Sequence, residues 1–252
     1  MDYESGTTHA AELLWREHAP PGGYPAGVLA VPEAIVGTSF FPGGFGLWNP
    51  AARRPLPAFP FGGTMVLGHD FHSEMGYAAS LARGFESPNQ PTWRNLTALM
   101  DEAGIRPESC FFTNVYMGLR AGSKTTGPFP GARDREFTAH CARFLARQLA
   151  VQRPRLILTL GVVAPYVLAP LSRSLAGWTA PRGLNRLDDA GPVQRSVPFD
   201  GIAGLRSTVV ALTHPCLRHA SVRHRRYRGL AGAAAEAAML VDALAGCQAI
   251  GS

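Results

Sequence analysis

Four short apolar runs are the most regular feature of the chain, and glycine, proline or polar residues flank each of them. They span 64–67 (TMVL), 110–116 (CFFTNVY), 155–161 (RLILTLG) and 207–213 (STVVALT). Runs of this length are typical of strands that are covered on both faces of a sheet. We therefore predict four buried strands.

Amphipathic helices are predicted between these runs. The clearest spans 137–149, where apolar residues recur every three or four positions. Other helices are predicted at 8–18, 93–103, 162–171 and 230–244. Thr92 is the expected cap of the second of these, and Gly246 is expected to end the last. Strands that alternate with helices predict a three-layer α/β/α sandwich around a four-stranded, mostly parallel sheet.

Two stretches lack this regularity. Residues 19–63 are dense in proline, glycine and aromatic residues, and 172–206 have mixed polarity. Dense proline prevents long helices and central strands, whereas aromatic side chains favour burial. We expect 1–63 to be a helix followed by an irregular arm packed on a main domain, 64–252. For 172–206 we expect an irregular segment with room for a hairpin.

Composition agrees with a folded protein, because hydrophobic residues make up 46% of the chain and charged residues only 17%. No apolar run reaches the roughly eighteen residues of a membrane span, and the first residues lack a signal-peptide pattern. We expect a cytoplasmic protein. The four cysteines lie far apart without a CxxC pair, so we expect reduced thiols.

Positive charge is concentrated late in the chain. The net charge is +6, and 214–228 carry no acidic residue. This stretch holds five arginines, namely Arg218, Arg223, Arg225, Arg226 and Arg228. A local basic patch of this kind suits a polyanion such as nucleic acid.

Polar residues follow three of the predicted strands. His69, Asp70 and His72 come after the first, Asn114 lies near the end of the second, and His214 follows the fourth. Ligands bind at the carboxyl ends of strands in open parallel sheets. We therefore expect these side chains to converge on one crevice.

Four stretches, taken together and in order, resemble the motifs of the uracil-DNA glycosylase superfamily. Residues 68–72 (GHDFH) are similar to its Gly-Gln-Asp-Pro-Tyr motif, and 91–96 (PTWRNL) to its Pro-Ser-x-x-Asn helix start. Residues 111–114 (FFTN) are similar to an apolar strand that ends in a base-reading Asn, and 213–217 (THPCL) to its His-Pro-Ser-Pro-Leu loop. The resemblance covers roughly 64–228.

The resemblance implies a monofunctional DNA glycosylase domain at 64–252, acting on DNA as a monomer without metal, other cofactor or obligatory protein partner. It implies that Asp70 stabilises the sugar cation and positions water, and that His214 stabilises the departing base. Asn114 would read the base. The other implied base-binding residues are His69, Phe71, His72 and Phe85, with Tyr77 as an alternative to Phe85 for stacking.

DNA contacts follow from the same resemblance. Leu217 or Arg218 lies where the family places its wedge residue, and Thr92 lies at a helix start that suits a phosphate. The arginines expected to hold phosphates include Arg223, Arg225 and Arg226. His72 stands where uracil-specific members have Tyr, so we hypothesise a pocket that admits a 5-modified pyrimidine, such as a modified cytosine in foreign DNA, instead of or in addition to uracil. Both DNA repair and antiviral defence fit such an activity.

Three other interpretations compete. A metal-dependent hydrolase would use His69, Asp70, His72 and His214 as ligands, but it leaves Asn114 and 92–95 unexplained. A phosphate-binding loop at 118–125 (GLRAGSKT) has Ser123 where glycine is required, and Gly127-Pro128 would break the helix that must follow. A catalytically inactive DNA-binding module is disfavoured by the presence of Asp70 and His214.

Overall fold

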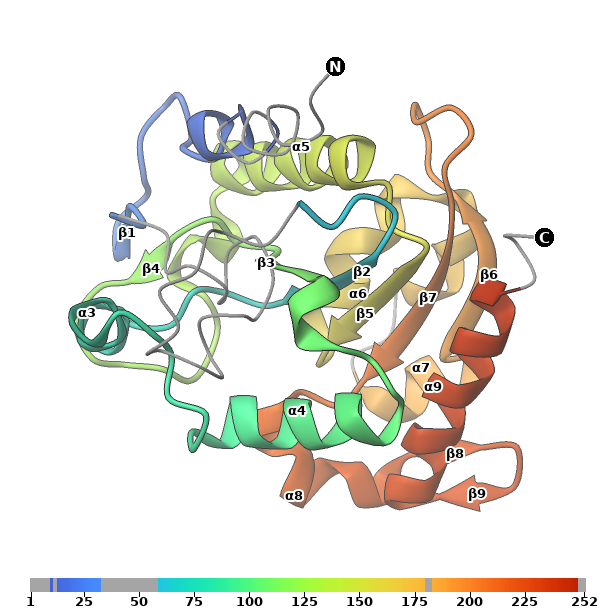
Figure 1. Cartoon of the computed structure of the whole chain (residues 1–252). Coiled ribbons are helices and arrows are strands. Elements are labelled where there is room, and N and C mark those ends of the chain that lie inside the picture. Colours follow the sequence, from blue (N-terminus) through green and yellow to red (C-terminus); the bar gives the residue numbers. More distant parts are fainter. Residues whose placement is uncertain (1–9, 11–12, 33–58, 180–182, 249–252) are drawn as a thin grey trace.

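A computed structural model describes residues 10, 13–32, 59–179 and 183–248. Its centre is a twisted five-stranded sheet in the order β3-β2-β5-β7-β6 (Figure 1). The strands are β2 (Thr64–Gly68), β3 (Cys110–Asn114), β5 (Leu156–Leu160), β6 (Val193–Pro198) and β7 (Arg206–Leu212). All neighbouring pairs are parallel except β6 with β7.

The sheet has five strands and not the predicted four. The additional strand, β6, lies within 172–206 and forms an antiparallel hairpin with β7, which confirms that this segment has room for a hairpin. Its residues VQRSVP lack the continuous apolar run of the other strands, because only Val197 of this strand is buried. The α/β sandwich and its mostly parallel sheet are confirmed.

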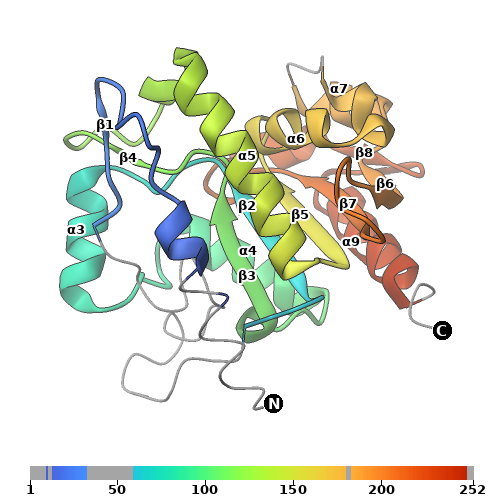
Figure 2. The ribbon, with the colours of Figure 1, turned by 90° about the horizontal axis from the view of Figure 1, so that it is seen from above.

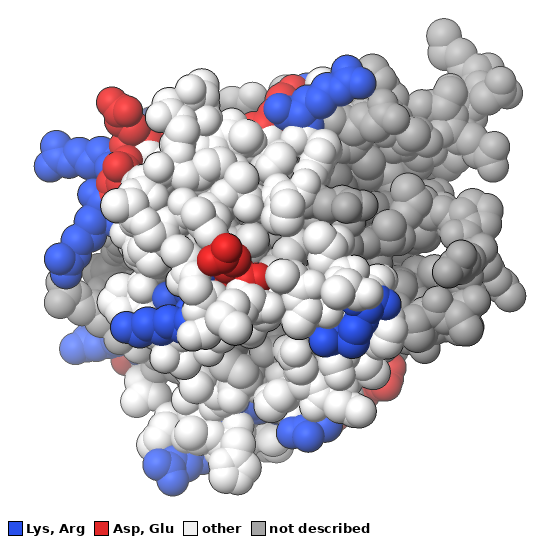
Figure 3. Space-filling model, turned by 90° about the vertical axis from the view of Figure 1, so that its left-hand side faces the viewer, with Lys and Arg blue, Asp and Glu red and all other residues white. Residues whose placement is uncertain are grey.

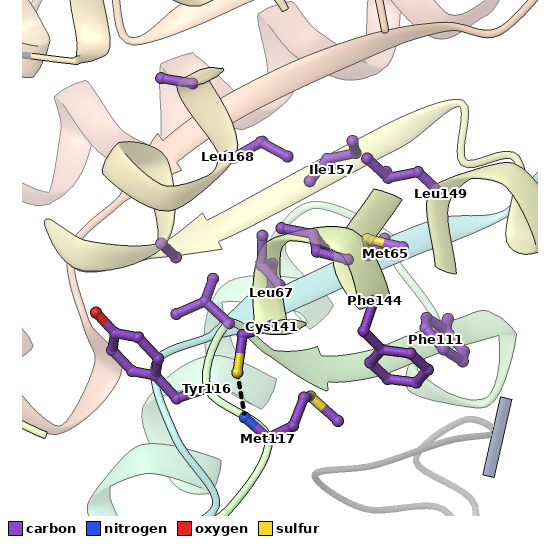
Figure 4. Close-up of a cluster of buried hydrophobic side chains, with 14 of the residues drawn as sticks. Met65, Leu67, Phe111, Tyr116, Met117, Cys141, Phe144, Leu149, Ile157 and Leu168 are labelled. Carbon is purple, nitrogen blue, oxygen red and sulfur yellow. Dashed lines mark hydrogen bonds between the residues drawn. The ribbon is translucent and has the colours of Figure 1, made fainter. Parts of the chain in front are cut away.

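Successive residues of the central strands alternate between two hydrophobic cores. Met65, Phe111 and Ile157 face a core shared with the helices α5 (Arg135–Gln152) and α6 (Val163–Leu168) (Figure 4). Val66 and Phe112 face the opposite core, shared with α4 (Pro91–Glu102) and α9 (Gly232–Gln248). Figure 2 shows these helices on the two faces of the sheet, so the three layers predicted from the sequence are present.

Most predicted helices are confirmed with shifted ends. The described part of the first is helical at 13–17. Helix α4 begins at Pro91 with Gln90 as its N-cap, so the prediction that Thr92 caps it is wrong. Proline occupies the first helical turn because it needs no hydrogen-bond acceptor there. Gly246 lies within α9 and does not end it.

Several elements were not predicted. Helix α3 (Glu74–Arg83) follows β2, with the side chain of Ser73 accepting a hydrogen bond from the backbone N–H of Gly76. Along the chain, the short helix α7 (Leu184–Asp189) precedes β6, and the short helix α8 (Arg218–Ser221) follows β7. The remaining strands are two-residue pairs, β1 (Val28–Leu29) with β4 (Leu119–Arg120) and β8 (Arg226–Tyr227) with β9 (Leu230–Ala231).

The described ends of the N-terminal arm contact the main domain. Val28 and Phe59 are buried, and Phe59 packs against Phe111 with ring centroids 5.4 Å apart. The expectation for 33–58 lies outside the described residues. On the side that carries α3, charged side chains are scattered between uncharged ones (Figure 3). Among the described residues, no helix is long and apolar enough to cross a membrane.

Candidate active site

The three polar strand-end residues lie together at the carboxyl edge of the parallel strands. Asp70 follows β2, Asn114 ends β3 and His214 follows β7. All three line one pocket of about 620 Å³, a volume typical of small-molecule sites, which span roughly 300–1,000 Å³. The predicted convergence of these residues is therefore confirmed.

Asp70 is held by three groups. Its Oδ1 accepts a hydrogen bond from the backbone N–H of His72 at 3.0 Å, and its Oδ2 lies 3.1 Å from Nδ1 of His69. Oδ2 also accepts hydrogen bonds from Nη2 and Nε of Arg120, at 2.8 and 3.2 Å. Burial opposes ionisation of Asp70, but the bonds from His69 and Arg120 outweigh burial and lower its pKa to about 2. The site therefore contains a fixed negative charge.

Arg120 is a site residue that the sequence analysis missed. It lies in β4, is 3% exposed and lines the pocket. Its guanidinium also donates to the carbonyl oxygens of Gly127 and Pro128, both at 3.0 Å, so the 120–128 loop wraps around it. A single arginine in a loop rich in glycine and threonine gives no sequence signal for a partner 50 residues earlier.

Asn114 lies directly over Gly68, its register partner on β2. A Cβ at position 68 would overlap Oδ1 of Asn114, so the amide occupies the space that a side chain would fill. Gly68 is thus required for this close approach. Asn114 is 6% exposed and lines the pocket.

His214 packs over the end of β5. A Cβ at Gly161, whose φ is +80°, would lie 3.2 Å from Cβ of His214. Asn95 of α4 donates a hydrogen bond from Nδ2 to the carbonyl oxygen of Pro215 at 2.8 Å, which ties the His214 loop to α4. Burial, followed by repulsion from His69, lowers the pKa of His214, although Asp70 acts in the opposite direction. The imidazole is therefore neutral at pH 7.

Some of the predicted base-binding residues line the pocket and others do not. His69 and Phe71 line the pocket, although Phe71 is only 1% exposed and packs on Tyr77. His72 also lines the pocket, and its backbone has a φ of +87°. Phe85 and Tyr77 do not line it, and stacking of either on a base stays a prediction. The aromatic residues among its lining are Phe71, Trp93 and Phe112.

The residues predicted to contact DNA differ in their exposure. Thr92 and Leu217 line the pocket, and Leu217 is 56% exposed. Arg223 and Arg226 are exposed, whereas Arg218 is half-buried in an ion pair with Glu236.

Arg225 is fully buried, so the prediction that it contacts phosphate is wrong. Its Nη2 lies 2.7 Å from Oδ1 of Asp188, and its Nη1 lies 3.2 Å from Oε1 of Glu236. Oε1 of Glu236 also accepts the backbone N–H of Thr213 at 2.5 Å. Arg225 therefore anchors the basic loop, residues 214–228, to α7 and α9 instead of contacting solvent.

The geometry gives little support to two of the alternatives. In the described part of the chain, no group of three or more His, Cys, Asp or Glu side chains is arranged to hold a metal ion. The loop at 118–125 contains β4, and the residues after it are exposed, with α5 beginning only at Arg135. A phosphate-binding loop needs a helix directly after it, so that interpretation is wrong.

Family comparison agrees with the arrangement of the pocket. The model of the uracil DNA glycosylase superfamily matches residues 39–228, a span that contains all four motif-like stretches. No curated protein matches the sequence. The chain belongs to the uracil-DNA glycosylase superfamily.

Proposed function

We propose that the protein is a monofunctional DNA glycosylase that extrudes a pyrimidine nucleotide from DNA and hydrolyses its N-glycosidic bond, leaving an abasic site. The observation that carries this proposal is the convergence of Asp70, Asn114 and His214 on one pocket. Extrusion costs a few kcal/mol of unstacking, which contacts to the DNA backbone offset. The family assignment supports action on DNA.

Asp70 would stabilise the sugar. Cleavage of the bond leaves positive charge on the sugar and negative charge on the base, so a preorganised carboxylate lowers the barrier. The lowered pKa of Asp70 supports this role, because the carboxylate stays ionised at neutral pH. Asp70 would also orient the attacking water.

His214 would stabilise the departing base as a neutral hydrogen-bond donor. Sγ of Cys216 lies 3.0 Å from Nδ1 of His214. Burial raises the pKa of the Cys216 thiol despite an opposing hydrogen bond with Thr92, which favours a protonated donor to Nδ1. A proton on Nε2 would then remain for the base anion.

A monofunctional mechanism is supported by the chain's lysine content. Glycosylases that also cleave the strand need an amine that attacks the sugar. Lys124 is the only lysine in the sequence, and it does not line the pocket. Water is therefore the proposed nucleophile.

Leu217 would fill the space that the extruded nucleotide leaves in the duplex. Its exposed side chain borders the pocket, and the exposed Arg223 and Arg226 follow on the same loop. An apolar wedge with flanking cations is a common means of holding unstacked DNA. We propose that these residues grip the strand that carries the target base.

The proposed substrates are uracil and pyrimidines modified at position 5. Replacement of the family's tyrosine by His72 supports the second group, because the His72 ring lies against Gly76, where a Cβ would overlap its Nδ1. The ring is thus turned toward α3. Such an enzyme would serve DNA repair, or defence against foreign DNA that carries modified cytosine.

The test is a base-release assay on oligonucleotides that each carry one target. The targets are uracil, thymine opposite guanine, 5-hydroxymethylcytosine and its glucosylated form, with EDTA present throughout. Abasic sites are revealed by alkaline cleavage. The proposal expects cleavage of at least one of these strands by the wild type and a rate at least about 100-fold lower for Asp70→Asn. DNA binding without base release from any strand would indicate an inactive DNA-binding module instead.

A further inference from the structure

A second carboxyl group lines the pocket, and the proposed chemistry does not use it. Glu86 follows α3 and is 7% exposed, yet it lines the same cavity as Asp70, Asn114 and His214. Burying a carboxyl group is costly unless it makes specific polar contacts. A carboxyl group at the wall of a substrate pocket is therefore a candidate for substrate recognition.

Side chains of two helices hold Glu86 in place. Ser80 of α3 donates a hydrogen bond from Oγ to Oε2 of Glu86 at 2.9 Å, and Nη2 of Arg83 donates to the same Oγ at 3.0 Å. The side chain of Trp93 in α4 acts as a further polar partner, which opposes the rise in the pKa of Glu86 caused by burial. An ionised carboxylate has about four acceptor positions. Two donors from the protein therefore leave acceptor capacity for a ligand.

A carboxylate can distinguish cytosine-type from uracil-type bases by the group at position 4. Cytosine and its 5-substituted forms carry an amino group there, which donates hydrogen bonds, whereas uracil and thymine carry a carbonyl oxygen. Glu and Asp accept from the cytosine amino group in DNA recognition. A carboxylate beside a carbonyl oxygen leaves both acceptors without a donor, which disfavours the uracil class.

Asn114 does not settle this choice, because its amide offers both a donor and an acceptor. The assignment of its oxygen and nitrogen can also reverse to suit either base. Glu86 can only accept when it is ionised. Because Asn114 can adapt to either base, the ionised Glu86 decides, and it favours bases that carry a hydrogen-bond donor at position 4.

We propose that Glu86 is a specificity-determining residue that accepts a hydrogen bond from the 4-amino group of the extruded base, so that the preferred substrates are cytosine-type bases, including 5-substituted ones. This inference rests on the proposed glycosylase function. Ser80, Arg83 and Trp93 are positioning residues for the carboxylate.

The test compares bases that differ only at position 4. Oligonucleotides carry uracil or cytosine as one pair, and 5-hydroxymethyluracil or 5-hydroxymethylcytosine as the other. Burial raises the pKa of Glu86, against the opposing effects of Ser80, His72, Arg83 and Trp93, so kcat/KM is measured at pH 8 to favour the carboxylate. The wild type is expected to favour the amino base of a pair by roughly 10- to 100-fold.

Glu86→Gln is the decisive variant, because the carboxamide keeps an oxygen for Ser80 and adds an NH₂ donor for a carbonyl at position 4. The variant is expected to bring the preference close to one, mainly by gaining activity on the uracil-type base. Glu17→Gln is the matched control, because it removes a surface carboxylate whose Oε2 lies 3.0 Å from Nε of Arg147. The control should keep the wild-type preference.

The outcomes separate this inference from the proposed function. Release of uracil-type bases in preference to cytosine-type bases by the wild type overturns the role of Glu86 and leaves the glycosylase function standing. An unchanged preference in a folded Glu86→Gln variant does the same. No release from any of these four strands, nor from the thymine and glucosylated strands of the base-release assay, overturns the proposed function itself. If Glu86→Gln does not fold, the wild-type ratio alone decides.

Discussion

Arg120 donates two hydrogen bonds to a single oxygen of Asp70, from Nη2 at 2.8 Å and from Nε at 3.2 Å. Because the guanidinium is buried, water screens this attraction weakly. The pair fixes both the charge and the direction of the carboxylate. Arg120 thus prepares Asp70 for its proposed role although it belongs to none of the four motif-like stretches.

Replacing Arg120 is expected to shift the pH dependence of base release. With the pKa of Asp70 held near 2, the carboxylate stays charged in mildly acidic solution. In Arg120→Met the burial of Asp70 is opposed only by His69 and by the backbone N–H of His72, so its pKa rises and the acidic limb of the rate profile moves to higher pH. Single-turnover rates from pH 4 to 8 measure this, and identical limbs would refute the coupling. Arg120→Lys keeps the positive charge and should shift less.

The same coupling predicts how stability depends on pH. A folded-state pKa below the unfolded value contributes stability that is present above the unfolded pKa and is lost as the pH falls through the folded pKa. For Asp70 this window runs from an ordinary pKa of 3.8 down to about 2, which corresponds to about 2 kcal/mol. Urea unfolding at pH 5 and pH 2.5 should therefore show a smaller loss for Asp70→Asn than for the wild type.

Asn95 is expected to act through the His214 loop. Asn95→Ala removes the bond to the carbonyl oxygen of Pro215, and the loss of one such bond should slow base release roughly five- to tenfold with little change in KM. Asn95→Asp is isosteric but lacks the donor, so it should slow base release about as much as Asn95→Ala does. Thr97→Ala, which loses bonds only within α4, is the control. A change confined to KM would contradict a positioning role.

Leu217→Ala should affect duplex substrates selectively. Because the side chain is 56% exposed, its removal should change the free energy of unfolding by less than about 0.5 kcal/mol. Base release from duplex DNA should fall about tenfold, and release from single strands should not, because no stacked neighbour must be displaced there. Leu230→Ala, at another exposed leucine, is the comparison. Equal losses on both substrates would argue against a wedge.

Substitution of two arginines of the basic loop should affect different properties, stability for Arg225 and DNA affinity for Arg223. Arg225→Ala removes the buried cation that Asp188 and Glu236 share and should lower the free energy of unfolding by about 3–5 kcal/mol. Arg223→Ala should leave stability unchanged but reduce the salt dependence of DNA affinity by about one unit in slope. Urea unfolding and binding titrations at several salt concentrations distinguish the two. A normal stability for Arg225→Ala would contradict its structural role.

The sequence predicted the parts of the fold that depend on local pattern. Continuous apolar runs marked β2, β3, β5 and β7, and because parallel strands end at one edge, their polar successors could be expected to meet. Helix α3 was missed because its residues EMGYAASLAR bury only Tyr77 and Ser80 and show little apolar periodicity. Strand β6 was missed because only Val197 of it is buried, so its sequence has no continuous apolar run.

Contacts between residues that are distant in the sequence could not be predicted from local sequence pattern. Arg223 and Arg225 lie in the same basic stretch, and the local sequence does not distinguish them. Only the fold brings Asp188 and Glu236 to Arg225. In the same way, α3 and α4 place Glu86 in the pocket in place of the neighbouring Phe85. The choice between burial and exposure for such charged residues depends on partners that are distant in sequence.

The central claim is that Asp70 acts at the sugar of an extruded pyrimidine nucleotide. It is tested most directly by the single-turnover rate of base release from a modified oligonucleotide, comparing the wild type with Asp70→Asn and with Asp101→Asn, which replaces an exposed aspartate of α4. The account predicts a rate at least about 100-fold lower for Asp70→Asn and an unchanged rate for Asp101→Asn. Equal rates for Asp70→Asn and the wild type would contradict it.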